Sequence, residues 1–227
     1  MRAAEYNGMW SPKNITQLPF PYSWELYQTI TVLDGSTFQL YLNNIKSLAM
    51  ELLTYTDMVV FNRCTQETPI DTFNRSIKAV NRRAEVMFET KDGETLQPED
   101  VLPYDRDQDV IHLEDEDYGI WYIDAMDKPD RYRGKTVEFT GMVLKTPDFP
   151  KNNFVPGRMA MTCCEADMTF LGFMCKAKNA RLLETKDWVK VRARVEYEYM
   201  PEYEGEGPML YADYVEKAEP IEEIVQF

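Results

Sequence analysis

Apolar and polar residues alternate most clearly near the C-terminus. From position 189 to position 199 every second residue is apolar, and those between are Lys, Arg or Glu. A period of two is that of a β-strand with one buried face. Residues 136–143 show the same period and follow a turn at Gly134 and Lys135. Gly141 within this strand predicts the sharp coiling that the first strand of a small barrel requires.

Further strands are predicted around these two. Residues 158–164 and 170–177 read as strands, 180–187 as a helical or irregular link, and 209–215 as a last strand after a turn-rich stretch. This order is the ground plan of the OB barrel, a partly open Greek key of five strands. The sequence therefore predicts a five-stranded OB-like β-barrel from about residue 132 to residue 218. An SH3-like barrel or a small sandwich also fits the pattern.

In the N-terminal half, segments with the period of a strand alternate with segments that have the 3.6-residue period of a helix. Strands are predicted at 29–33 and 58–61, and a hairpin at 84–96. A helix starts at Thr68-Pro69, where a hydroxyl cap precedes proline at the first helical position. Another helix is predicted from an apolar stripe at helical spacing, made by Phe38, Leu42, Ile45, Ala49 and Leu52. The fold class is α+β, with a mixed α/β N-terminal half followed by the barrel.

Three regions follow from these elements. Residues 1–28 form an extended arm that Trp10, Phe20, Tyr22 and Trp24 are expected to pin to the body. Residues 29–108 form an α+β domain that ends in an acidic, turn-rich stretch. Residues 109–227 form the barrel domain with a leading strand and helix.

Residues 30–45 and 111–126 align without a gap and show weak similarity. Each segment predicts a strand, an acidic turn and a helix. The first domain is therefore either a degenerate repeat of the second or similar to it by chance.

The formal net charge of −14, with a pI near 4.6, limits the partners of this acidic protein. Such a surface repels phosphate backbones and argues against generic nucleic-acid binding. It is compatible with cations, basic partners or neutral ligands, and also with solubility alone. No stretch approaches the roughly 20 apolar residues of a transmembrane helix, so the sequence as given predicts a soluble chain.

The adjacent cysteines Cys163 and Cys164 are the sharpest chemical feature. On a regular strand they face opposite ways, whereas a turn at Cys164 would gather Cys164, Glu165 and Asp167 at the barrel rim. Three interpretations stay open: a buried cysteine with an incidental neighbour, a thiophilic metal site, and a strained vicinal disulfide. Arg158 either pairs with Asp167 or lies on the surface.

Two other residues are candidate metal ligands. His112 is the only histidine, which excludes multi-histidine sites, and Cys175 is a further thiol. Neither a phosphate-binding glycine loop nor a nucleophile elbow is present. We therefore expect a non-enzymatic protein.

Two segments resemble a known family. Residues 127–141, DKPDRYRGKTVEFTG, and residues 154–167, FVPGRMAMTCCEAD, are similar to two hallmarks of the YcgQ-like permease-complex subunit family. The second hallmark is a strand led by Arg158 that ends in T-C-C-x-A-D, from Thr162 to Asp167. The resemblance covers about residues 110–218. Members carry membrane helices ahead of this part, which are absent here, and are predicted to act beside a permease.

The resemblance implies a non-catalytic accessory or binding module with a membrane permease as partner. It also implies association with the cell envelope; otherwise we expect a cytoplasmic location. The predicted cofactor is zinc or another thiophilic metal ion, held by Cys163, Cys164 and Asp167. The supporting motif residues are Arg158, Thr162, Glu165, Gly134, Lys135 and Gly141.

Two alternatives remain. One is an OB-fold nucleic-acid-binding protein that uses Lys190, Arg192 and Arg194 on the outer face of one strand. The other is a thiol redox protein that uses the vicinal cysteine pair.

Overall fold

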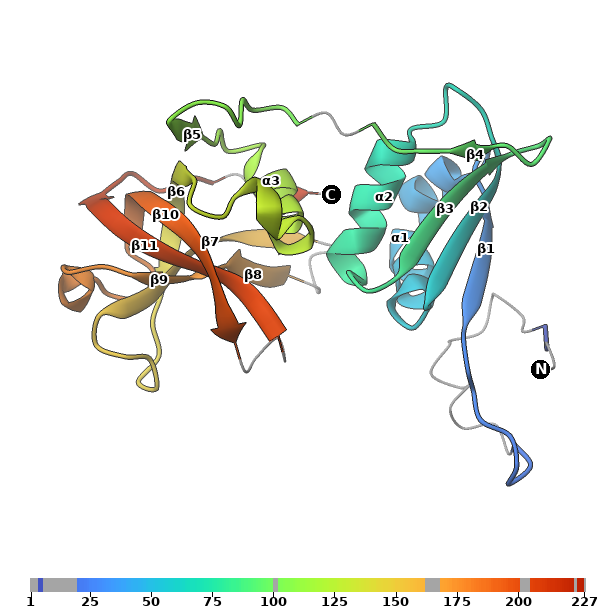
Figure 1. Ribbon diagram of the computed structural model, residues 1–227, viewed down its shortest axis with the longest axis horizontal. Helices are drawn as coiled ribbons and strands as arrows, with labels where there is room; N and C mark the ends of the chain where they lie inside the picture. Colours follow the sequence, from blue (N-terminus) through green and yellow to red (C-terminus); the bar gives the residue numbers. More distant parts are fainter. Residues whose placement is uncertain are drawn as a thin grey trace. The chain divides into compact units, whose positions relative to one another are not determined.

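The computed structural model describes residues 4–5, 20–99, 102–161, 168–200, 205–222 and 224–226. The chain divides into two compact units, residues 1–100 (unit 1) and 101–227 (unit 2), shown in Figure 1. The division at residue 100 lies eight residues before the boundary that the sequence predicts, within the acidic, turn-rich stretch that ends the predicted first domain. Among the described residues, no helix combines the length and the apolar character that crossing a membrane requires.

Unit 1 is a four-stranded sheet with two crossover helices. Its strands lie in the order β1-β2-β3-β4, with the first three parallel and β4 antiparallel to β3. The elements are β1 (Ile30–Asp34), α1 (Phe38–Thr54), β2 (Met58–Cys64), α2 (Ile70–Val80), β3 (Glu85–Thr90) and β4 (Thr95–Leu96). Both helices lie on one face of the sheet, since the Phe38 ring of α1 and the Phe73 ring of α2 both contact Phe61 of β2.

The core of unit 1 is built around four phenylalanines. The Phe61 ring on β2 lies 5.0 Å from the Phe38 ring of α1, 5.3 Å from Phe73 of α2 and 5.0 Å from Phe88 of β3. All four side chains are buried. Aromatic contacts at these distances add to the stabilisation from burial.

Of the five positions of the apolar stripe predicted for α1, two are buried. Phe38 and Ala49 are buried, but Ile45 has non-helical backbone angles and is exposed. The resulting kink shifts the phase of the helix, so that Met50 and Leu53 are buried while Leu52 is only half-buried. Of the aromatic residues expected to pin the arm, Phe20, Tyr22 and Trp24 have exposed side chains, and Trp10 lies outside the described residues.

Unit 2 is a closed barrel of five strands. Its ring runs β6-β7-β9-β11-β10 and back to β6, and β8, β5 and β12 pair at its margins. The barrel elements are β6 (Thr136–Leu144), β7 (Asn153–Met161), β8 (Met168–Gly172), β9 (Met174–Lys176), a 3-10 turn (Ala180–Leu182), β10 (Trp188–Met200) and β11 (Gly205–Lys217). β9 and β11 close the ring as a parallel pair, while the other pairs of the ring are antiparallel. This confirms the predicted OB-like barrel.

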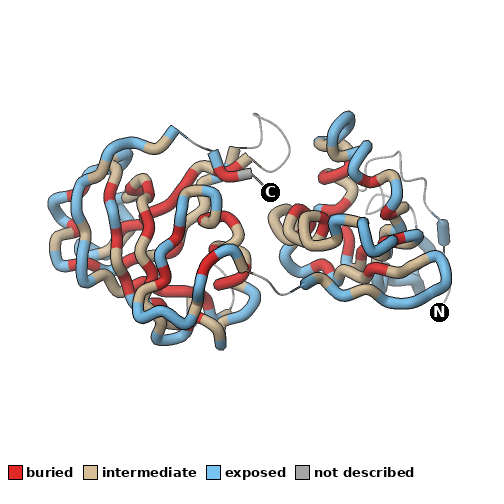
Figure 2. The backbone as a smooth tube through the Cα atoms, turned by 90° about the horizontal axis from the view of Figure 1, so that it is seen from above, coloured by how far each residue is buried: buried red, intermediate tan, exposed pale blue. Residues whose placement is uncertain are grey.

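A strand and a helix precede the barrel. β5 (Val110–His112) pairs in parallel with β6, and α3 (Tyr118–Asp127) inserts Tyr118, Trp121 and Ala125 into the core. Units 1 and 2 thus each begin with a strand, a turn and a helix, as the compared segments predict. In Figure 2 the buried residues of unit 2 run along its strands and the adjoining helix.

Unit 2 differs from the sequence prediction in several details, among them the predicted strand 170–177, which is divided into β8 and β9. Tyr199 is exposed although it continues the apolar alternation of β10, because that strand extends past the barrel with Tyr199 opposite Glu206. β11 begins at Gly205, inside the stretch predicted as a turn. A short strand, β12 (Val225–Gln226), pairs in parallel with β7 and was not predicted.

Candidate functional site

The predicted cysteine motif lies between two paired strands. β7 and β8 are antiparallel neighbours, and the last pair of their register is Met161 opposite Met168. Residues 162–167 connect these two positions and lie outside the described residues. The predicted residues Thr162, Cys163, Cys164, Glu165 and Asp167 therefore have no described geometry, whereas their anchoring strands do.

The two faces of the β7–β8 hairpin differ in chemistry. Arg158 and Ala160 are buried on the inner face. Met159, Met161 and Met168 are half-buried and share the other face, because paired residues of antiparallel strands lie on the same side. Three thioether side chains therefore flank the segment that contains Cys163 and Cys164.

Arg158 lies inside the protein and not on its surface. Its side chain is 1% exposed, and its guanidinium pairs with Asp115 Oδ1 at 2.8 Å. The guanidinium carbon also lies 5.7 Å from the centre of the Trp188 ring. The surface interpretation is therefore wrong, and the predicted partner Asp167 falls outside the described residues. Arg158 ties β7 to the turn before α3.

The other two candidate ligands lie elsewhere. Cys175 is fully buried in the barrel core, and this burial raises the pKa of its thiol, which disfavours the thiolate that a metal needs. His112 is exposed on β5, with its Nδ1 3.2 Å from Glu138 Oε1. Among the described residues, no group of three or more His, Cys, Asp or Glu side chains is arranged to hold a metal ion.

The predicted motif residues before the hairpin have structural positions. Gly134 has a φ of +77°, which favours glycine, and its N–H donates to the Val195 carbonyl at 2.8 Å. The Lys135 carbonyl accepts from the Val195 N–H at the same distance. A Cβ on Gly141 would lie 2.9 Å from the Gly157 nitrogen, so β6 and β7 approach closely where the barrel coils. These residues begin and shape the barrel.

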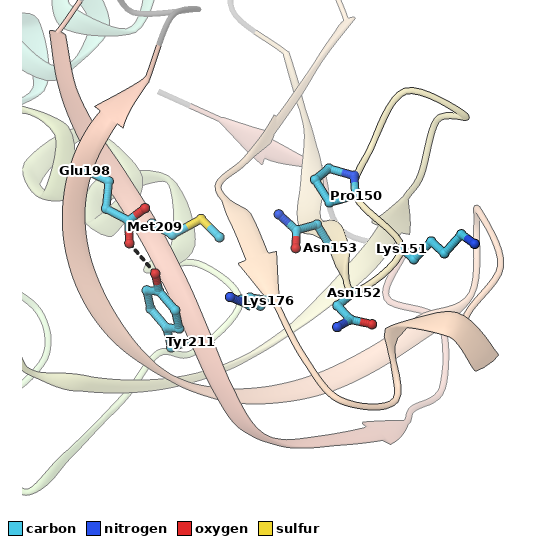
Figure 3. Close-up of a pocket in the computed structure, with 8 residues that line it drawn as sticks. All are labelled: Pro150, Lys151, Asn152, Asn153, Lys176, Glu198, Met209 and Tyr211. Carbon is cyan, nitrogen blue, oxygen red and sulfur yellow. Dashed lines mark hydrogen bonds between the residues drawn. The ribbon is translucent and has the colours of Figure 1, made fainter.

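A second feature, which sequence reasoning missed, is a pocket of about 340 Å³ on the side of the barrel (Figure 3). It lies where the β6–β7 loop meets β9, β10 and β11. The lining residues are Pro150, Lys151, Asn152, Asn153, Lys176, Glu198, Met209 and Tyr211. They come from four separated segments, and only the Pro- and Asn-rich loop gave a signal in the sequence.

A hydrogen bond joins two polar groups of the pocket. The Tyr211 hydroxyl donates to Glu198 Oε1, and this bond raises the pKa of the tyrosine. Lys176 Nζ lies 5.8 Å from the centre of the Tyr211 ring. In Figure 3, Asn153 and Lys176 point toward the Glu198–Tyr211 pair, whereas Lys151 points away.

The cations proposed for nucleic-acid binding are paired with carboxylates. Lys190 Nζ lies 2.8 Å from Glu138 Oε1, Arg192 Nε 3.1 Å from Asp213 Oδ1, and Arg194 Nε 3.2 Å from Glu196 Oε1. Each positive charge on this face of β10 therefore has a negative neighbour. Such a face offers little attraction to a phosphate backbone.

Comparisons with known proteins identify a family for more than half of the chain. The model described as the DUF1980 C-terminal domain matches residues 88–225. No functionally curated protein matches the chain.

Two solved structures resemble part of the fold. One is OBody NL8 bound to hen egg-white lysozyme, with a TM-score of 0.26 and 11% identity, covering 39% of this chain and 100% of that one. The other is described as an aspartyl-tRNA synthetase from Leishmania major Friedlin, with a TM-score of 0.28 and 12% identity. That match covers 53% of this chain but 23% of the synthetase. Neither likeness is close enough to indicate a ligand or an activity.

Proposed function

We propose that this chain, which belongs to the DUF1980 C-terminal domain family, is a non-catalytic binding module that holds a thiophilic metal ion at the β7–β8 hairpin. Zinc or another thiophilic ion would be bound by Cys163 and Cys164, with Asp167 as an oxygen ligand. The resemblance to permease-complex subunits suggests a membrane permease as the partner that receives or delivers the ion.

The observation that carries this proposal is the methionine pair that closes the hairpin. Met161 opposes Met168, and Met159 lies on the same face two residues away. Residues 162–167, which include both cysteines, join these two strand ends in the sequence. Thiolates and thioethers are the ligands that soft metals prefer. The methionines at the strand ends and the cysteines in the intervening sequence are therefore donors of the kind that such an ion prefers.

Two further observations support a binding role over catalysis. The only histidine, His112, is 58% exposed and its ring lies beside Glu138, which also accepts from Lys190. The net charge of −14 attracts cations to the whole surface. Binding of a metal ion, and not acid–base chemistry, agrees best with these features.

The test is titration of the reduced full chain with Zn²⁺ and, separately, with Ag⁺ as a soft monovalent probe, by isothermal calorimetry. We expect Cys163→Ser and Cys164→Ser each to weaken binding by about tenfold or more. Met87→Leu, which changes a half-buried methionine on β3, should leave the affinity unchanged. Equal affinity in the wild type and both serine variants would overturn the proposal. A Cys163–Cys164 disulfide that forms in air and excludes metal would favour the redox alternative instead.

A further inference from the structure

The pocket on the barrel side lies at the place where the ring closes. Lys176 ends β9, while Met209 and Tyr211 lie on β11, and these two strands form the parallel closing pair. On the other side of β9 lie Pro150 to Asn152 of the β6–β7 loop and Asn153, the first residue of β7, which pairs with Lys176. In OB barrels generally, this loop and the neighbouring strands form a ligand-binding surface. The pocket is distinct from the β7–β8 hairpin.

The wall made by the loop is held in place by hydrogen bonds. The Asn152 carbonyl accepts from the Ala177 N–H at 3.0 Å, and the Asn153 N–H donates to the Pro150 carbonyl at 2.8 Å. At the start of the loop, Lys145 Nζ donates to the carbonyls of Ala180 and Leu183 at 2.8 and 2.9 Å. A pocket with a fixed wall loses less entropy when it binds a ligand.

The polar side chains of the pocket include both hydrogen-bond donors and hydrogen-bond acceptors. The Glu198 carboxylate accepts, the Lys176 ammonium donates, and the Asn153 carboxamide does both. Met209 and the Tyr211 ring add an apolar surface between them. One cation, Lys176, and one anion, Glu198, point into the space, while Lys151, which also lines the pocket, points away from it (Figure 3).

We propose that this pocket binds a neutral saccharide of one or two rings. Sugar hydroxyls both donate and accept, which matches Glu198, Lys176 and Asn153, while the C–H face of a pyranose can lie on the Tyr211 ring. An anionic ligand would meet the Glu198 carboxylate. A zwitterion would gain little, because Glu198 and Lys176 are exposed and solvated charges attract weakly. The volume of about 340 Å³ falls in the range of small-molecule sites.

The experiment is a titration of the ¹⁵N-labelled full chain, followed by amide chemical shifts. The probes are maltose, cellobiose and N,N′-diacetylchitobiose, with glycine and inorganic phosphate tested separately. We expect at least one disaccharide to shift the amides of residues 150–153, 174–177 and 209–211. Glu198→Gln and Asn153→Ala should each weaken that binding by roughly tenfold, the value of about one strong hydrogen bond.

The chain offers a matched control. The Tyr214 hydroxyl also donates to a carboxylate, that of Glu216, but this pair lies outside the pocket. Tyr211→Ala should abolish saccharide binding, whereas Tyr214→Ala should leave it unchanged, with thermal unfolding confirming that both variants fold. Shifts with glycine or phosphate alone, shifts located elsewhere, or no shift with any disaccharide would each overturn the proposal.

Discussion

Unit 1 and unit 2 both combine strands with helices, but only unit 2 closes its sheet. In unit 1 both helices lie on the face that bears Phe61, and the edge strand β1 leaves Ile30 and Val32 53% and 61% exposed. Parallel sheets are usually covered on both faces. In unit 2 the strands bury one face inside the ring, and closure removes most of the edges.

The comparison shows how each unit distributes its stabilising contacts. Unit 1 concentrates its aromatic packing in one cluster of four rings, whereas unit 2 spreads its core over α3 and all five strands of the ring. Loss of one side chain should therefore affect the two units differently. The predictions below separate them, from the largest expected effect to the smallest.

Phe61→Ala should give the largest effect. It removes the ring that contacts three others and should cost unit 1 about 3–5 kcal/mol, a large part of the 5–15 kcal/mol that stabilises a typical domain. Hydrogen exchange measured by mass spectrometry should show protection lost in β2 and β3 but kept in β10. In the matched variant Phe173→Ala, unit 2 should lose protection instead. If both units lose protection together in either variant, they do not unfold separately.

Gly157→Ala should strain the barrel. A Cβ there would lie 2.2 Å from the Leu171 carbonyl oxygen and 2.7 Å from the Phe170 ring, and the backbone oxygen cannot move without disturbing the β7–β8 pairing. We expect a loss of about 1–3 kcal/mol in urea unfolding. Thr169→Ala, an exposed change on β8, should stay within about 0.5 kcal/mol. An unchanged Gly157→Ala variant would show that the contact is not tight.

Alkaline pH should destabilise unit 2 selectively. Burial raises the pKa of Tyr104, Tyr118, Tyr132 and Tyr197 in the folded state. Their contribution is therefore fully present below the unfolded pKa of about 10 and is lost as pH rises through the higher folded values. The tyrosines described in unit 1 are exposed.

Tyr132→Phe isolates this effect. The Tyr132 hydroxyl donates to Asp124 Oδ2 at 2.6 Å, so its removal should cost about 1 kcal/mol at neutral pH. The variant should also show a flatter decline in melting temperature above pH ~10. An unchanged slope, or unit 1 melting first at high pH, would contradict this assignment.

Glu138→Gln should have the smallest effect. The hydrogen bond from Lys190 lowers the pKa of Glu138, with further contributions from the nearby His112 charge. The stabilisation is therefore present above the ordinary value of 4.5 and is lost as pH falls through the lower folded pKa. We expect less than about 1 kcal/mol, measured as melting temperature against pH, and a smaller difference at high salt. Glu222→Gln, an exposed change, is the control and should have no effect.

The sequence predicted the barrel better than it predicted the side pocket and the buried ion pair. The alternation from Val189 to Tyr197 matches buried positions directly, because a strand with one buried face imposes a period of two. The kink at Ile45 and the exposure of Tyr199 depend on tertiary contacts that a periodic pattern does not contain. The Arg158–Asp115 pair joins residues 43 positions apart, so no local signal pointed to it. The side pocket was missed for the same reason, since four distant segments form it.

In the barrel ring, β9 is held by few residue pairs: three at its seam with β11, Met174–Lys176 against Met209–Tyr211, and two at its junction with β7. Local opening of the ring should therefore cost little free energy at β9, since it follows the number of buried contacts. Lys176 and Tyr211 lie on opposite sides of that seam. A ligand that contacts both residues should stabilise the closed barrel. The fraction of protein with ligand bound would then determine how often the barrel opens locally.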